Sequence, residues 1–378
     1  MAITRALHKT VVRHTFEQLP DELLVEILSH LSDRDLGAAL CSSQRFTVLR
    51  EQVWRAVCAR RWPQWFAVVK VTQVPWRRQA ELLSLREREL VVQPNQRAIQ
   101  KTQTVVTPNN RAVLAEWLAE VSWDWQLEST IVFKAIAYLD NYLSCHDVAE
   151  LSRFQLVGIA CLRAAMGDVQ RKRGFQDESL ARNMSPERFA YISDSTYTAA
   201  QVVDMTALIQ ECTPDALRTS PNSKMFLRSF WYRLVQAEAA SSEEMHIYTL
   251  SSFFLQLTLL NLECSMLPAS LLAAASLANS LEVYGKEVWP AIVQQYSAYT
   301  HADITRARKH IQSVQEVVPA GHIRALWRKH HEAHGYDAFQ VEWQRALSLV
   351  ASPCPTPVYL PSSDSLGSMV SSQTEGPK

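Results

Sequence analysis

The alternation of apolar and polar positions is most regular over residues 110–143, where it predicts two consecutive helices. Apolar side chains at positions 113, 114, 117, 118 and 121 follow one stripe with a 3.6-residue period. The stripe breaks over residues 124–128 and starts again at Ile131, continuing to Leu139. The pattern therefore indicates two helices that each bury one face and are joined by a short turn.

Two strongly charged side chains, Arg111 and Asp140, fall within these apolar stripes. A charge is tolerated in an apolar interior only when an opposite charge pairs with it. We therefore expect a buried Arg111–Asp140 ion pair that joins the two helices.

Helical periodicity also covers the N-terminal part of the chain. The apolar positions 23, 24, 27, 28 and 31 form a short amphipathic helix, and Ser32 with Asp35 three positions later is typical of a capped start to the next one. Val53 and Trp54 mark a third helix, which ends near Trp62. Three short helices bury little surface by themselves, so this region needs a partner.

A linker follows, with a predicted helix beginning at Pro75 and Trp76 and a predicted loop over residues 93–110. Further helices are predicted at 151–166, from Ser185 onward, and at 198–212. A second set appears in similar order at 225–235, 248–262, 268–281, 288–296 and 303–314. Residues 298–300 also repeat the Tyr-Thr ending of residues 195–198, which favours tandem copies of one five-helix unit.

Composition narrows the class of protein. Only 9 glycines in 378 residues and 47% hydrophobic residues fit an all-α protein with several cores. The 38 basic and 38 acidic residues balance, which favours protein partners over nucleic acid or a membrane surface. The seven cysteines are scattered and show no C-x-x-C spacing, which suggests free thiols. The sequence also has no long apolar run and no start that resembles a signal peptide, so we expect an intracellular protein.

These patterns predict a linear organisation of the chain. We expect an N-terminal tail (1–15), a three-helix module (16–66), a helical linker (67–109), two five-helix repeats (110–217 and 218–318), a C-terminal helix (319–350) and a disordered tail (351–378).

The helix pair at residues 110–143 resembles the opening of a cyclin box in residue type and in spacing. The residues that carry the resemblance are Arg111, Ala112, Leu114, Trp117, Leu118, Glu120, Val121, Tyr138, Asp140 and Leu143. It continues through residues 154–160 and 189–198 and into the second set of helices. The resemblance implies an all-α fold with tandem five-helix cyclin repeats.

Residues 16–65 are similar to an F-box, the module that docks cullin-based ubiquitin ligases through their adaptor subunit. The family's tryptophan after the second helix is Phe46 in this chain. The alternative is an ordinary helical subdomain packed on the rest of the chain. The resemblance implies that the adaptor is bound by Leu19, Pro20, Leu23, Leu24, Ile27, Leu28 and Leu36.

Cyclins also have a hydrophobic patch that binds Arg-x-Leu peptides. In this chain the resemblance assigns that patch to Asn110, Val113, Leu114, Trp117, Glu120, Phe154 and Gln155. An apolar slot suits a leucine side chain, and a carboxylate on its rim suits an arginine. The alternative is that Val113, Leu114 and Trp117 belong only to the core.

The cyclin pair that hydrogen-bonds to a kinase, a lysine and a glutamate, is replaced in this chain. At the aligned positions stand Met166 and Thr206, which bring neither a cation nor an anion. This difference argues against kinase binding.

Catalytic and metal-binding patterns are missing from the sequence. There is no glycine-rich phosphate loop and no paired nucleophile and base, so the sequence does not favour an enzyme or a cofactor. His330 and His334 stand at a metal-ligand spacing without a third ligand, which is more typical of a solvated helix face.

Together the two modules resemble the cyclin F-like family. The resemblance implies a non-catalytic substrate receptor of an SCF-type ubiquitin ligase, bound through its adaptor to a cullin, active in the cell cycle in nucleus and cytoplasm. The alternative is a regulatory cyclin that binds and activates a cyclin-dependent kinase, with residues 16–65 as a helical extension.

Overall fold

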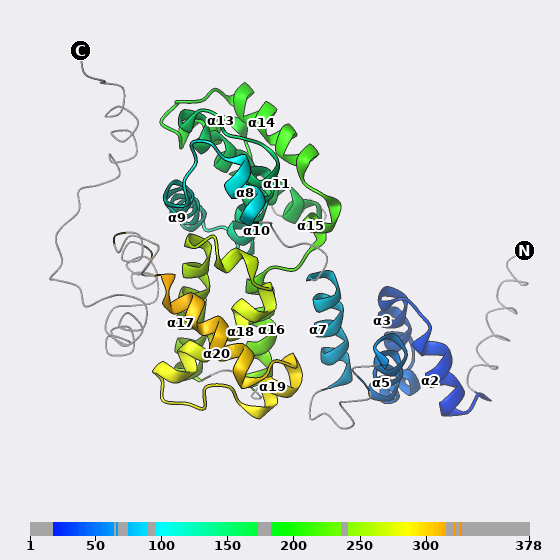
Figure 1. Ribbon diagram of the computed structural model, residues 1–378. Helices are drawn as coiled ribbons and strands as arrows, with labels where there is room; N and C mark the ends of the chain where they lie inside the picture. The colour runs from blue at the N-terminus through cyan, green and yellow to red at the C-terminus, as the bar shows by residue number, and fades with distance from the viewer. Residues whose placement is uncertain are drawn as a thin grey trace, which may run out of the picture. The chain divides into compact units, whose positions relative to one another are not determined.

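The computed structural model describes residues 18–63, 66, 75–89, 96–172, 183–235, 241–314, 321 and 326. The regular structure of these described residues is helical, without a strand, as the sequence predicts (Figure 1). They form two compact units. One comprises Met1–Glu87 with Ala291–Ala298, and the other comprises Arg88–Pro290 with Tyr299–Lys378.

Over residues 18–61 the structure describes four helices of the first unit, one more than the sequence pattern predicts. They are α2 (Asp21–Ser29), α3 (Asp33–Ser42), α4 (Gln44–Val48) and α5 (Arg50–Arg61). The Ser32 hydroxyl accepts a hydrogen bond from the backbone N–H of Asp35 at 3.2 Å, so the predicted cap of α3 is present. The extra helix is α4, which has no buried residue and therefore leaves no apolar stripe in the sequence.

The same unit contains α7 (Trp76–Glu89) as far as Glu87, and α19 (Ala291–Ser297), which packs on it. The Gln79 side-chain amide donates to the Tyr296 carbonyl, and the Tyr296 hydroxyl donates to the Arg78 carbonyl, both at 3.3 Å. Trp76 and Ala80 also pack against the core of α2–α5. The linker helix thus begins at Trp76, as the sequence indicates.

The loop predicted over residues 93–110 is wrong in part, because the second unit has a helix there, α8 (Gln96–Thr102). This helix packs on α10 (Thr130–Cys145). The Gln103 side chain that follows it donates to the carbonyls of Leu143 and His146 at 2.7 and 2.6 Å. Tertiary contacts of this kind stabilise a short polar helix that has little periodicity of its own.

The first five-helix repeat consists of α9 (Pro108–Asp124), α10, α11 (Phe154–Lys172), α13 (Pro186–Tyr191) and α14 (Ala199–Cys212). Helix α10 is central, because it packs against α8, α9, α11 and α14. At Gly158 on α11, an added Cβ atom would lie 2.8 Å from a methyl carbon of Leu114. Glycine at this position therefore allows α9 and α11 to approach closely.

The predicted ion pair between Arg111 and Asp140 is present and buried. The Arg111 Nε and Nη2 atoms donate to the two Asp140 carboxylate oxygens at 2.6 and 2.7 Å. Arg111 Nη1 donates in addition to the carbonyl of Leu259 at 2.8 Å, on α17 (Ser242–Leu260). One guanidinium group therefore joins both helices of the predicted pair to the second repeat.

The second repeat contains α16 (Ser223–Leu234), α17, α18 (Ala269–Val283) and α20 (His301–Gln312), with α18 packed against the other three. Thr198 and Thr300 form capping boxes at the starts of α14 and α20. The preceding tyrosines reach equivalent places: the Tyr197 hydroxyl donates to the Ser152 carbonyl just before α11, and the Tyr299 hydroxyl pairs with Ser270 at the start of α18. These equivalences confirm the tandem repeat.

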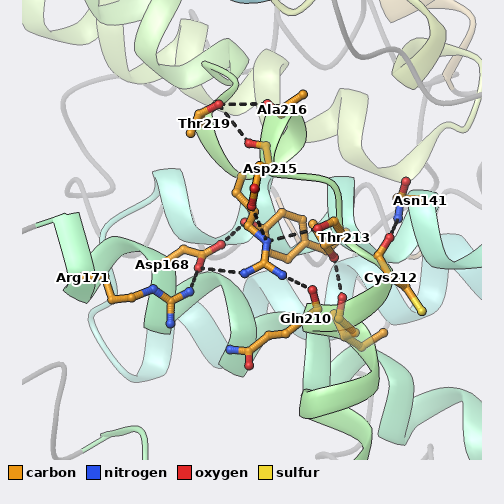
Figure 2. A network of polar contacts seen from close by, with 12 residues as sticks. Asn141, Asp168, Arg171, Gln210, Cys212, Thr213, Asp215, Ala216 and Thr219 are labelled. Atoms are coloured by element: carbon orange, nitrogen blue, oxygen red, sulfur yellow. Dashed lines mark hydrogen bonds and ion pairs between the residues drawn. The ribbon is translucent and has the colours of Figure 1, made fainter.

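Polar contacts fix the segment between the repeats, which includes α15 (Asp215–Thr219) (Figure 2). Arg218 donates from Nε to the Thr213 carbonyl at 3.1 Å and from Nη2 to the Gln210 carbonyl, and its Nη1 lies 4.0 Å from Asp168 Oδ1. The Asn141 side-chain amide donates to the Cys212 carbonyl at 3.1 Å. The segment is thus tied to α10, α11 and α14.

Two buried lysines were not predicted. Lys134 on α10 donates to the Arg218 carbonyl. Lys224 on α16 is 7% exposed, donates to the Ser252 hydroxyl, and lies 4.7 Å above the Tyr248 ring. Burial, together with a smaller contribution from repulsion by Arg228, lowers the pKa of Lys224 from 10.5 to about 7.

We expect Lys224 to make stability depend on pH. Between about pH 7 and 10.5 the unfolded chain binds more protons at this residue than the folded chain, so stability at this site rises with pH. Replacing Lys224 with Met removes this pH dependence of the free energy of unfolding, which amounts to at most about 1.4 kcal/mol per pH unit. In thermal melts from pH 7 to 10, we expect the variant to be more stable than the unmodified protein at pH 7 and its advantage to shrink as pH rises.

The control is Lys286→Met, at an exposed lysine that pairs with Glu243 at 3.0 Å. Its melting temperature is expected to follow that of the unmodified protein at every pH. A constant difference between Lys224→Met and the unmodified protein across the range would contradict the assignment.

Candidate protein-docking sites

Helix α2 has one face in the core of the first unit and one face exposed. Leu24 and Leu28 are 0% and 3% exposed and pack with Leu36 of α3 in that core. Leu23 and Ile27 point outward, with 51% and 41% of their surface exposed. The predicted adaptor-binding set therefore divides into residues that build the fold and residues that are accessible.

The Leu19–Pro20 pair precedes α2 and is held in a defined position. Pro20 is exposed and occupies the N-cap of the helix, whereas Leu19 is half-buried against the core. The Arg45 guanidinium donates to the Leu19 carbonyl at 2.7 Å and forms an ion pair with Asp21 at 2.5 Å. The start of α2 is thus fixed by a contact from α4.

Two further apolar residues are exposed in the same unit and were not predicted as contacts. Leu31, which follows the end of α2, is 36% exposed, and Val48 on α4 is 77% exposed. The spacing 23, 27, 31 is visible in the sequence and is a signal for Leu31. Val48 has no such signal because α4 itself was not predicted.

The seven predicted patch residues divide in the same way across α9 and α11. Leu114 and Phe154 are buried, and Leu114 packs on Gly158. The other five are partly exposed: Asn110, Val113, Trp117, Glu120 and Gln155. Since α9 and α11 pack directly on each other, these five form the accessible part of the patch, here called the α9 patch.

Asn110 has a second role at the start of α9. Its side-chain oxygen accepts hydrogen bonds from the backbone N–H and the hydroxyl of Thr107, at 2.9 and 2.6 Å, and the Thr107 hydroxyl accepts from the Asn110 N–H at 3.2 Å. This is a capping box. The side chain of Asn110 is therefore held in place by the start of α9.

The two positions aligned with the cyclin kinase-binding pair are buried. Met166 is enclosed in α11, and the Thr206 hydroxyl donates to the Val202 carbonyl at 2.6 Å within α14. Neither side chain presents a polar group at the surface.

A cavity of about 500 Å³ lies where the two repeats meet, and Arg111 and Asp140 are among the residues that line it. None of the predicted docking residues lines this cavity. Among the described residues no cluster of three or more His, Cys, Asp or Glu side chains is suited to a metal ion, and no described helix is long and apolar enough to cross a membrane. His330 and His334 lie outside the described residues.

Three domain families match this chain in the order of its modules. The F-box-like family matches residues 16–60, the family "Cyclin, N-terminal domain" residues 81–211, and the family "Cyclin, C-terminal domain" residues 221–341. The chain thus has an F-box-like domain followed by an N-terminal and a C-terminal cyclin domain. The F-box match covers the helices that carry the exposed α2 stripe, and the first cyclin match includes α9 and α11.

Curated relatives are cyclins. Cyclin-A1-4 of Oryza sativa subsp. japonica is 29% identical over 257 residues, 67% of this chain and 67% of that protein. Cyclin-A1-1 of the same plant is 28% identical over 258 residues, which cover 67% of this chain and 47% of that protein. G2/mitotic-specific cyclin-B2 of Rana japonica is 30% identical over 230 residues, 60% of this chain and 53% of that protein. The chain thus spans about half the length of several of these relatives.

The fold is also similar to a solved structure, a viral cyclin from herpesvirus saimiri. The two share 18% sequence identity with a TM-score of 0.50, over 65% of this chain and 99% of the viral protein. At this identity the similarity supports the fold alone.

Adjacent residues of α2 give a matched test of its two faces. We expect Leu28→Ala to lower the free energy of unfolding of the first unit by about 2–5 kcal/mol, because it opens a cavity in the core. Ile27→Ala is expected to change it by no more than about 0.5 kcal/mol, because the side chain is already partly in water. Denaturant unfolding of the two variants measures both effects, and equal losses would show that α2 is rotated relative to this description.

Proposed function

We propose that this protein is a non-catalytic substrate-recognition subunit of an SCF-type cullin-RING ubiquitin ligase. Its F-box docks the adaptor subunit, which connects it to the cullin, and its first cyclin domain captures substrates. Other subunits of the ligase supply the ubiquitin-transfer chemistry. The observation that carries the proposal is the exposed apolar stripe of α2, next to exposed Pro20, in a chain that also has cyclin domains.

The accessible part of the F-box fits a protein partner. Leu23 and Ile27 form an exposed apolar stripe on α2 after Pro20, exposed Leu31 follows the end of that helix, and the core of the first unit is built from other residues. Covering exposed apolar area is favourable by roughly 25 cal/mol per Å². The adaptor therefore contacts Leu19, Pro20, Leu23 and Ile27 directly, while Leu24, Leu28 and Leu36 hold these contacts in place.

The α9 patch fits a short peptide with an arginine and a leucine. Val113 and Trp117 offer a partly exposed apolar surface above buried Leu114. Glu120 stands one turn farther along the same helix and offers a carboxylate for a cation. Substrates are therefore proteins that carry an Arg-x-Leu-like motif in an accessible segment.

The relatives support a proposed role in the cell cycle. They include plant A-type cyclins and G2/mitotic-specific cyclins, which favours substrates of cell-cycle control. We propose in addition that the receptor works in nucleus and cytoplasm.

The alternative function is that of a regulatory cyclin that binds and activates a cyclin-dependent kinase, which the two cyclin domains themselves favour. Charge-assisted hydrogen bonds of the cyclin–kinase type need an accessible cation and anion. Buried Met166 and Thr206 supply neither, so we place kinase binding second.

The adaptor contact has a direct test. We expect Leu23→Ala combined with Ile27→Ala to abolish co-purification of the adaptor without changing the melting temperature, because both side chains are exposed. Leu19→Ala and Pro20→Ala are also expected to weaken binding of the adaptor. Leu208→Ala, an exposed leucine on α14, is the control. Unchanged adaptor binding together with an active kinase in the same pull-down would favour the alternative.

The α9 patch is tested by peptide binding. We expect Trp117→Ala with Glu120→Ala to weaken binding of a labelled Arg-x-Leu peptide by at least tenfold, which corresponds to at least about 1.4 kcal/mol, while adaptor binding stays intact. Val203→Ala, an exposed valine on α14, serves as the control in the same anisotropy titration. Equal affinity of the double variant and the unmodified protein would refute the patch assignment.

A further inference from the structure

The capping box fixes the orientation of the Asn110 side-chain amide. Backbone N–H groups only donate hydrogen bonds, so the Asn110 atom that faces the Thr107 N–H at 2.9 Å must be the oxygen. The same oxygen accepts from the Thr107 hydroxyl at 2.6 Å. The amide nitrogen of Asn110 therefore points away from Thr107.

This amide nitrogen makes no hydrogen bond to the described part of the chain, since the side-chain contacts of Asn110 all run through its oxygen. The residue is partly exposed. Asn110, Val113 and Trp117 are spaced by three and four residues and so share one face of α9. The α9 patch thus has two donor hydrogens at one end and the Glu120 carboxylate near the other.

The two polar residues at the ends of the patch, Asn110 and Glu120, are separated by a defined length of α9. Ten residues separate Asn110 from Glu120, which corresponds to about 15 Å along a helix. An extended peptide rises about 3.3 Å per residue, so it spans this length in four to five residues. The start of α9 also favours a negative charge, because the helix dipole is positive there.

We propose that Asn110 is a specificity-determining residue that selects peptides with a carboxylate side chain about four residues after the arginine. This inference rests on the proposed docking of Arg-x-Leu peptides. The arginine pairs with Glu120, the leucine lies on Val113 and Trp117, and the carboxylate accepts a hydrogen bond from the Asn110 amide nitrogen. The preferred motif is Arg-x-Leu-x-Asp or Arg-x-Leu-x-Glu, whereas an apolar residue in the last position is disfavoured.

The test compares two labelled peptides, acetylated and amidated at their ends, on the full chain. One contains Arg-Ala-Leu-Ala-Asp and the other Arg-Ala-Leu-Ala-Leu. We expect the unmodified protein to bind the Asp peptide about tenfold more tightly, the size typical of a hydrogen bond to a charged group.

Two variants separate the amide donor from the cap. Asn110→Asp keeps an oxygen that accepts from Thr107, and so keeps the cap, but replaces the donor with a negative oxygen. It is expected to lose the preference for the Asp peptide and to bind the Leu peptide as before. Asn110→Met removes both groups and is expected to reverse the preference in favour of the Leu peptide. Melting temperatures show that each variant is folded.

The possible outcomes distinguish this inference from the proposed function. If Asn110→Asp keeps the preference for the Asp peptide, or if Asn110→Met weakens both peptides equally, Asn110 is only a helix cap and the inference is overturned. If the unmodified protein binds neither peptide and still binds the adaptor, the α9 patch is not the docking site, and the peptide part of the proposed function fails with it.

Discussion

The buried contact of Arg111 with Asp140 and with the Leu259 carbonyl is the interaction on which the cyclin domains depend. It connects α9, α10 and α17 through one guanidinium group, and therefore connects the two repeats. Breaking such a pair leaves a buried charge without a partner, at a cost of about 3–5 kcal/mol. Because Arg111 lies on α9 between the patch residues Asn110 and Val113, the same contact holds the candidate peptide-binding helix against the core.

In both candidate docking sites one helix has two apolar faces, of which one is buried and the other is exposed or partly exposed. On α9, Leu114 and Leu118 are buried while Val113 and Trp117 remain partly exposed. On α2, Leu24 is buried while its neighbour Leu23 is exposed. A helix held by its inward face can present its outward face without rearrangement, which lowers the entropic cost of binding a partner.

Two cationic side chains, Lys134 and Arg218, donate hydrogen bonds to backbone carbonyls and so stabilise the fold of the cyclin domains. Lys134 binds the carbonyl of Arg218, and Arg218 in turn binds carbonyls at the end of α14, so the segment between the repeats is held by positive charges from two sides. Lys224 differs, because in the second repeat its ammonium group meets a hydroxyl and an aromatic ring. The second repeat thus contains a buried amine whose pKa is lowered by burial to about 7.

The sequence by itself determined the all-α class, the tandem repeat, the Ser32 cap and the Arg111–Asp140 pair, because helical periodicity and the rule that buried charges are paired act within short segments. It missed α4 and α8, which lack an apolar stripe of their own, and it missed the burial of Lys134 and Lys224. Only the tertiary structure decided which leucines of α2 and which residues of the α9 patch face outward. The physical reason is that an apolar stripe wider than the buried face leaves the rotation of the helix open, and the neighbouring helices fix that rotation.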